Sequence, residues 1–224
     1  TDATQAVGKI PVDFRDLGVD ALTFSAHKFH GPASIGGLLL KHGTVLHPLF
    51  HGGLQQLAMR PGTESVALAV GMQVALNLCK QGAPSHEESV LEMRNLFEKM
   101  LQEKLPWISI TSQGSPRLPH VSNIAFPGLN RQALMMALDL AGIACSTGSA
   151  CASGSTDPSP VLQAMGLAEE LVESALRFSF GRHNLPAECQ LAANIVEASA
   201  THLKGTNPLE KTASQPPQEA PKQL

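Results

Sequence analysis

Hydrophobic residues near the start of the chain come in short runs that are typical of strands. One run, Val19–Thr23, precedes a polar stretch that ends in Gly31-Pro32, a turn signal, and another run, Ile35–Leu40, follows it. We therefore expect two buried strands with Lys28 in the loop between them. A lysine held there is well placed to be partly desolvated, and a neutral amine can attack a carbonyl to form a Schiff base.

Apolar residues at helical spacing predict several helices further along the chain. Gln81–Ser85 is expected to separate the first two, because Gly82 and Pro84 both disfavour a helix interior. Ser85 and Glu88 then form the capping-box pattern of the second helix, and Asn130 suits the cap of a third. The predicted helices cover residues 66–80, 85–104, 131–140, 168–175 and 186–204.

Short strand patterns alternate with these helices in the second half of the chain, over residues 107–111, 121–126, 142–146 and 176–180. This order predicts a small mixed sheet with helices packed on one face. The composition then turns to Pro, Gln, Lys, Glu and Thr, which is typical of a disordered tail. We expect a part of a larger domain over residues 1–84, a connector helix and small domain over 85–204, and the tail over 205–224.

The composition of the chain argues against several classes of function but does not identify one. The chain has 224 residues, 43% of them hydrophobic, and a net charge of -3, which gives no electrostatic case for nucleic acid or an anionic membrane. It contains no apolar run of the roughly 20 residues that a membrane span needs, and its start lacks the pattern of a signal peptide. The four cysteines are scattered, without metal-ligand or disulfide spacing, so we expect a reducing, cytoplasmic setting.

One cysteine lies in a stretch with almost nothing to pack. Residues 146–155 are nearly all small, which predicts an exposed and mobile loop around Cys151. An accessible thiolate is a nucleophile, whereas an inert small residue is the alternative for a lone loop cysteine. Cys145 falls in the strand before the loop and is expected to be buried, and Cys79 and Cys189 fall in helices and are expected to be structural.

Five motifs occur in a specific order, and together they identify a family better than any one of them does. They are Thr1–Asp13, Ser25–Lys28, Arg60–Glu64, Ser146–Cys151 and Leu176–Arg182. In this order the chain resembles the pyridoxal-phosphate-dependent cysteine desulfurases of the NifS/IscS type, within the fold-type-I aminotransferase superfamily.

The resemblance runs from Thr1 to about Leu203 and covers only the second half or so of such an enzyme. It implies an α/β fold, namely the C-terminal part of the large cofactor-binding domain followed by a smaller α+β C-terminal domain. The chain also opens directly at a predicted strand end carrying Asp2, so we interpret it as a fragment. The segment that such enzymes have before this point would carry further cofactor contacts.

The resemblance implies a cofactor site in the first third of the chain. Lys28 would hold pyridoxal 5'-phosphate as a Schiff base, and Asp2 would pair with the ring nitrogen and keep it protonated. Gln5 would contact the ring oxygen, and Ser25 and His27 would lie near the phosphate. On the residues alone, an exposed lysine, a turn aspartate and a solvated glutamine are the competing interpretations.

The resemblance also implies that one residue of this chain contacts the cofactor of a second subunit. The loop that ends at Thr63 would cross a homodimer interface, and the Thr63 hydroxyl would bind the cofactor phosphate of the partner. The alternative for Thr63 is the N-cap of the helix that follows, and the two roles are compatible.

Substrate chemistry is implied for the second half. Arg177 would bind the α-carboxylate of L-cysteine, because a guanidinium offers a bidentate fork that lysine lacks. Cys151 would take the substrate sulfur as a persulfide, release L-alanine, and pass the sulfur to an acceptor or scaffold protein for iron–sulfur cluster assembly. A surface ion pair is the competing interpretation for Arg177, and we favour it for the nearby Arg182.

Two other functions fit the same residues. One is a different fold-type-I enzyme, such as a selenocysteine lyase. The other is a catalytically inactive, truncated protein that acts as a dimerisation or scaffold partner.

Overall fold

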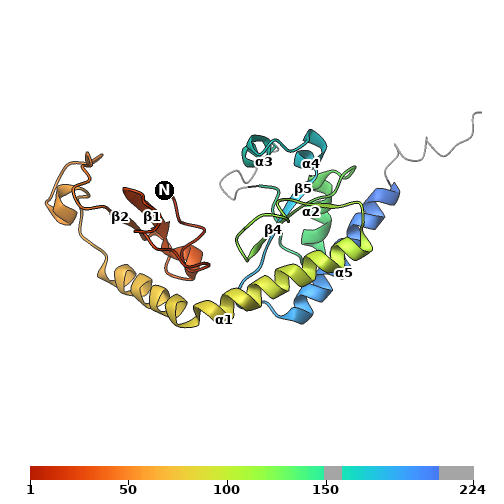
Figure 1. Ribbon diagram of the computed structural model, residues 1–224, viewed down its shortest axis with the longest axis horizontal. Coiled ribbons are helices and arrows are strands. Elements are labelled where there is room, and N and C mark those ends of the chain that lie inside the picture. Colours follow the sequence, from red (N-terminus) through yellow and green to blue (C-terminus); the bar gives the residue numbers. More distant parts are fainter. Residues whose placement is uncertain (149–157, 207–224) are drawn as a thin grey trace, which may run out of the picture. The chain divides into compact units, whose positions relative to one another are not determined.

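The computed structural model describes residues 1–148 and 158–206, apart from the side chains of residues 82–86. The chain divides into two compact units, Thr1–Ser89 and a second one that begins at Val90. Figure 1 labels most of the helices and strands of both units. Cys151 and the predicted tail lie outside the described residues.

The first unit is built on a strand pair. Strand β1, Ala21–Ser25, runs antiparallel to β2, Gly36–Leu40, and Asp2 forms an isolated parallel bridge to Thr23 on the other edge of β1. The two strands confirm the sequence prediction. The expectation that both strands are buried is wrong for β2, because Leu38, Leu39 and Leu40 are 38–49% exposed. Among the described residues β2 pairs only with β1.

A small apolar cluster fixes the turn after β1. Its buried members are Ala26, Phe29 and Ala75, and partly buried residues such as Val7 and Met72 pack around them. Ala26 and Phe29 belong to η1, a single 3-10 turn over Ala26–Phe29. The lysine predicted in a loop therefore lies in a helical turn that is held on both sides by buried neighbours.

Helix α1 spans Val66–Lys104 without interruption, which corrects the predicted break at Gln81–Ser85. A proline inside a helix removes one backbone hydrogen bond and costs about 3 kcal/mol, but its φ is compatible with a helix. Each end of α1 packs within its own unit, and this packing offsets the cost. Ser85 is therefore an interior position of α1 and not an N-cap.

The start of α1 also differs from the prediction. The helix begins at Val66, and the carbonyl of Ser65 accepts the first intrahelical hydrogen bond, from the Ala69 amide at 3.0 Å. Ser65 thus occupies the N-cap position, and Thr63 lies two residues before it. The capping alternative for Thr63 is wrong, because the chain is still non-helical there. Between β2 and α1, a short 3-10 turn, η2, covers Gln55–Ala58.

The second unit contains a three-stranded sheet in the order β3-β4-β5. The strands are Ser109–Ile110, Val121–Ala125 and Ala175–Ser179, and both pairings are antiparallel. The described strands therefore form an antiparallel sheet and not the predicted mixed one. The predicted strand over residues 142–146 is reduced to one bridge, Ser146 to Arg177.

Among the described residues, four helices complete this unit besides the end of α1. Helix α2, Arg131–Leu140, matches the prediction, and the Asn130 side chain accepts hydrogen bonds from the amides of Gln132 and Ala133, both at 3.0 Å. The predicted helix over 168–175 is shorter, since Ala175 already belongs to β5. The remaining helices are α3, Pro160–Ala164, which the sequence pattern did not predict, α4, Glu169–Glu173, and α5, Pro186–Thr206.

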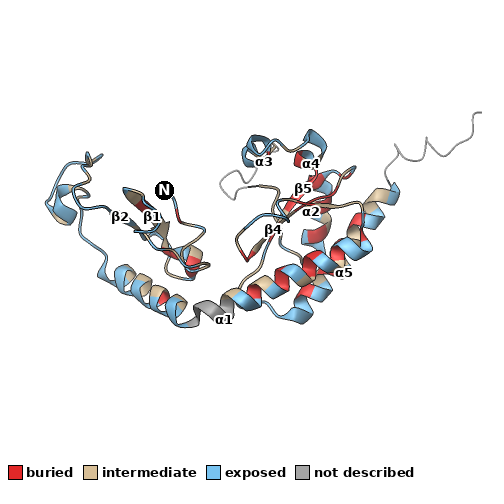
Figure 2. Ribbon diagram, viewed as in Figure 1, coloured by how far each residue is buried: buried red, intermediate tan, exposed pale blue. Residues whose placement is uncertain are grey.

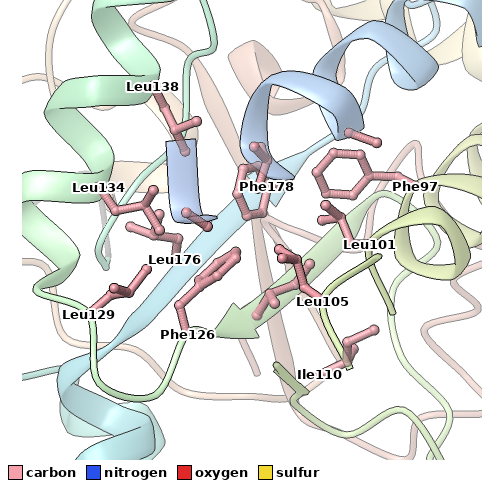
Figure 3. Close-up of a cluster of buried hydrophobic side chains, with 14 residues drawn as sticks. Phe97, Leu101, Leu105, Ile110, Phe126, Leu129, Leu134, Leu138, Leu176 and Phe178 are labelled. Atoms are coloured by element: carbon pink, nitrogen blue, oxygen red, sulfur yellow. The ribbon is translucent and has the colours of Figure 1, made fainter. Parts of the chain in front are cut away.

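The largest buried cluster described in the second unit has fourteen residues, and two smaller clusters lie in the same unit. Figure 3 shows Phe126, Leu176 and Phe178 of the sheet segment pointing toward leucines of α2 and the end of α1. Phe97 of α1 packs its ring 5.0 Å from that of Phe178. Figure 2 shows buried positions recurring along α1 after residue 90, whereas its first turns are largely exposed.

Candidate functional site

Lys28 is held at the end of β1 by its immediate neighbours. Ala26 and Phe29 are 0% and 1% exposed, so the turn that carries Lys28 cannot rotate freely. His30 ends the turn with a positive φ of 66°, which sends the chain back toward β2. Lys28 is half-buried, and its ammonium has no hydrogen-bond or ion-pair partner among the described residues. An unpartnered, half-buried amine is a group available to a ligand.

Ser25 and His27 flank this lysine and are joined to each other. Ser25 Oγ and His27 Nδ1 are hydrogen-bonded at 2.8 Å. His27 is exposed and Ser25 is half-buried, so the pair faces solvent at the carboxyl end of β1. Hydroxyl and imidazole groups at a strand end suit an anionic oxygen such as that of a phosphate.

Asp2 lies at the same end of the strands as this pair. Asp2 and Thr23 form a parallel bridge, so the segment around Asp2 runs in the same direction as β1. The residues that follow Asp2 and those that follow β1 therefore lie at the same end of the two segments. Asp2 Oδ1 accepts a hydrogen bond from the Thr4 amide at 2.8 Å. Hydrogen bonds from the side chain and backbone of Thr4, and from the Thr23 side chain, lower the pKa of Asp2. The carboxylate therefore stays ionised at neutral pH and suits a cationic partner.

Gln5 and Thr63 are both exposed side chains. Gln5 lies in the turn after Asp2, where the Ala6 and Val7 amides both donate to the Ala3 carbonyl at 2.9 Å. Thr63 lies in the loop before α1, and that loop is braced by a hydrogen bond from the Gly62 amide to Gln55 Oε1 at 3.3 Å.

Arg177 lies in the middle of β5, in the second unit. Its backbone is paired on both edges, with Asn123 of β4 on one side and with Ser146 on the other. The Arg177 amide donates to the Ser146 carbonyl at 2.7 Å, and the Ser146 amide donates back at 3.0 Å. The half-buried guanidinium makes no hydrogen bond or ion pair within the described part of the chain, so the surface ion pair is not seen there.

Ser146 opens one of the five motifs, but the sequence pattern gave it no structural role of its own. Its hydroxyl donates to the Gly148 carbonyl at 2.8 Å and accepts from the Gly148 amide at 3.2 Å. This turn ends the pairing with β5 after one residue. A serine two residues before a glycine is a turn signal, but only the sheet shows that it lies opposite Arg177.

The three described cysteines, Cys79, Cys145 and Cys189, are free thiols. Cys145 is half-buried against the main core and belongs to no paired strand, which corrects its expected place in a strand of the buried core. Burial, and secondarily the charge of Asp139, raises the pKa of Cys145 to about 11. Burial also raises the pKa of Cys189, so both thiols stay protonated and unreactive at neutral pH.

The structure thus brings Asp2, Ser25, His27 and Lys28 to one end of the strands of the first unit. Thr63 lies on a separate loop of that unit, and Arg177 lies in the second unit. No group of three or more potential metal-ligating side chains occurs among the described residues. None of the described helices has the length and apolar composition needed to cross a membrane.

The described residues thus form an α/β chain with a half-buried lysine after a strand and an ionised aspartate beside that strand. Comparison with known proteins gives the family. The sequence profile of the family "Aminotransferase class-V" matches residues 1–191, and the chain belongs to this family.

Curated relatives of this chain within the family are named cysteine desulfurases. The chain is 37% identical over 208 residues to "Cysteine desulfurase IscS" of Dictyoglomus turgidum, covering 93% of this chain and 53% of that protein. It is 38% identical over 208 residues to "Cysteine desulfurase" of Gluconacetobacter diazotrophicus, covering 93% and 52%. The chain therefore spans about half the length of the curated relatives it matches, and the resemblance read from the motifs is confirmed.

Solved structures agree with the fold. A NifS-like protein from Rickettsia africae matches with a TM-score of 0.81 at 28% identity, over 89% of this chain and 52% of that one. A structure described as "SspA in complex with cysteine" matches with a TM-score of 0.61 at 32% identity, over 83% and 50%. These matches confirm the expected fold class, the C-terminal part of a fold-type-I transferase with its smaller domain.

Proposed function

We propose that this chain provides the cofactor lysine, the substrate arginine and the sulfur-accepting cysteine of a cysteine desulfurase. The observation that supports this most directly is the half-buried Lys28 amine, which has no partner among the described residues and follows the strand that Asp2 bridges. An amine in that position suits covalent attachment of a carbonyl compound.

The residues present fit pyridoxal 5'-phosphate. The Asp2 carboxylate, kept ionised by its hydrogen bonds, suits the pyridinium nitrogen, and the Ser25–His27 pair suits the phosphate. Lys28 would hold the cofactor aldehyde, with Gln5 at its ring oxygen. When bound, the cofactor supplies an electron sink that makes the α-carbon of an amino acid acidic.

Side chains of the second half would handle the substrate. Arg177 would bind the α-carboxylate of L-cysteine through its fork, since its backbone is fixed by pairing on both edges. The Cys151 thiolate would form a bond to the substrate sulfur while the carbon–sulfur bond breaks, which leaves a persulfide on Cys151. The carbon gains a proton, and the product is L-alanine.

The proposal includes partners and a compartment. We place Thr63 at the cofactor phosphate of a second subunit in a homodimer, and we expect a sulfur-acceptor or scaffold protein of iron–sulfur cluster assembly to receive the sulfur. Persulfide transfer needs reduced thiols, so we place the protein in the cytoplasm. The structure described as SspA with cysteine supports L-cysteine as the substrate class.

Sulfur release tests the function and separates it from the alternatives. The chain is assayed with pyridoxal phosphate, alone and together with the other half of a cysteine desulfurase, and alanine and persulfide are measured. We expect L-cysteine to yield both products in the combined sample. Activity restricted to L-selenocysteine would indicate a lyase for that substrate. Binding of the other half without turnover of either amino acid would indicate an inactive scaffold partner.

A further inference from the structure

The second unit buries a carboxylate that the proposed function does not use. Glu98 of α1 is 3% exposed, and Arg117 donates to both of its oxygens at 2.7 Å. The Ser122 hydroxyl of β4 also donates to Glu98 Oε1 at 2.7 Å. These three hydrogen bonds satisfy the carboxylate and tie α1 to the sheet.

A second guanidinium lies beside the same carboxylate. The Arg94 side chain is 8% exposed, and its Nε lies 4.0 Å from Glu98 Oε1. Arg94 Nη1 donates to the Leu118 carbonyl at 2.9 Å, and Nη2 and Nε donate to Asn95 Oδ1 at 2.9 and 3.3 Å. The hydrogen bonds of Arg94 therefore go to neutral acceptors. Its contact with the Glu98 carboxylate, at 4.0 Å, is longer than any of these hydrogen bonds.

The charges of this cluster do not balance. Two guanidiniums face one carboxylate, and within the described residues no other acidic side chain lies within 4.0 Å of Arg94 or Arg117. Burial, followed by the positive charge of Arg117, lowers the pKa of Arg94, and the charge of Glu98 offsets only part of this effect. A buried charge without compensation is costly, so an anion at this position would stabilise the fold.

The cluster opens into a cleft that can admit such an anion. The cleft has a volume of about 410 Å³ and lies between α1 and the segment 113–117. Its walls carry further polar groups, including Ser115 and the amides of Gln102 and Gln113, which bond to each other at 3.0 Å. Lys99 at the edge adds positive charge, although it is 3.9 Å from Glu103. The volume falls within the range of about 300–1,000 Å³ that is typical of ligand pockets.

We propose that this cleft binds a small dissolved oxyanion, with a carboxylate or phosphate group between Arg94 and Arg117. A guanidinium presents five N–H groups, and Arg117 uses two of them on Glu98, which leaves the others for an anion with two or more oxygens. All lining residues belong to the second unit. The site is therefore independent of the proposed desulfurase function and is testable without turnover.

The test is a titration of the 224-residue chain with phosphate and, separately, with succinate, at constant ionic strength held by chloride. NMR signals of the Arg94 and Arg117 Nε–H groups report the site directly. We expect these signals to shift and saturate with phosphate, with succinate, or with both, and the tighter ligand identifies the preferred group. Arg117→Gln should weaken binding about tenfold, because it removes a charge-assisted pair.

Two more variants make the result decisive even if Arg117→Gln fails to fold. Glu98→Gln keeps the shape but removes the competing negative charge, so it should tighten anion binding. Arg182→Gln removes an exposed arginine of the same unit that does not line the cleft and should leave binding unchanged. Shifts that fail to saturate with both anions, or binding that Glu98→Gln does not strengthen, would overturn the proposal.

Discussion

The two units differ in how much apolar surface they bury among their own residues. The second unit has a cluster of fourteen buried residues that joins α1, α2, α5 and the sheet. The comparable cluster of the first unit has three, Ala26, Phe29 and Ala75. Large apolar side chains of the first unit are instead exposed, with Val66 at 71% and Leu57 at 93%.

The candidate cofactor residues lie in the unit with the smaller core. Asp2, Ser25, His27 and Lys28 depend on one strand pair and one helical turn. Arg177, in contrast, lies in a strand whose neighbouring residues Leu176 and Phe178 belong to the large cluster. Substitutions can therefore test the candidate cofactor residues separately from the stability of the second unit.

The largest expected effect is the loss of the covalent cofactor link in Lys28→Ala. A Schiff base needs the amine of Lys28, so removing it should abolish the link completely without changing the second unit. The measurement is borohydride reduction of the cofactor-loaded enzyme that contains this chain, followed by mass spectrometry of its peptides. Lys41→Ala is the matched control, because Lys41 is an exposed lysine of the same unit. A reduced cofactor found on any lysine of Lys28→Ala would contradict the assignment.

A comparably large effect on persulfide formation should distinguish Cys151 from Cys145, which lies six positions before it in the sequence. Cys151→Ser should lose persulfide and sulfide formation, whereas Cys145→Ser should keep both. With a pKa of about 11, only about one Cys145 thiol in ten thousand is ionised at pH 7. Mass spectrometry of the alkylated persulfide identifies the cysteine that carries it. Persulfide on Cys145, or full turnover in Cys151→Ser, is the outcome that excludes this mechanism.

The raised pKa of Cys145 also predicts how the reactivity of this thiol depends on pH. Below its pKa the thiolate fraction rises about tenfold per pH unit, so alkylation of Cys145 should speed up about a hundredfold between pH 7 and 9. Iodoacetamide labelling followed by peptide mapping measures the rate. A rate that levels off below pH 9 would mean that burial does not hold the thiol in its neutral form.

Removing one ring from the large core should cost stability. Phe126 is 0% exposed, and Phe126→Ala should lower the free energy of unfolding by about 3–5 kcal/mol. Leu57→Ala, at a 93% exposed position of the first unit, should change it by no more than about 0.5 kcal/mol. Urea unfolding followed by circular dichroism measures both. Equal losses in the two variants would show that the first unit buries Leu57.

The smallest effect is expected at the start of α2. Asn130→Ala removes the side chain that accepts from two backbone amides, and it should cost about 1 kcal/mol. Asn130→Asp keeps an acceptor and should restore most of the stability. The midpoint of thermal unfolding reports the difference, and an unchanged midpoint in Asn130→Ala would mean that other groups satisfy those amides.

Local signals in the sequence predicted elements wherever those signals agreed with each other. For helix α2, one short segment of the sequence indicates the N-cap, the apolar face and the first and last residues. The structure agrees with all three predictions. The strands on either side of Lys28 were also predictable, because turn residues separate two apolar runs. The motif order identified the family, since it depends on residue identity and not on packing.

Contacts between residues far apart in the chain account for what the sequence did not predict. The continuity of α1 through Pro84 follows from packing at both of its ends, which outweighs a local breaking signal. The pairing of Ser146 with Arg177 and the contact of Arg117 with Glu98 join segments that no periodicity connects. Local propensity contributes tenths of a kcal/mol per residue, whereas burial of a charge or a ring contributes several, so long-range contacts prevail where the two disagree.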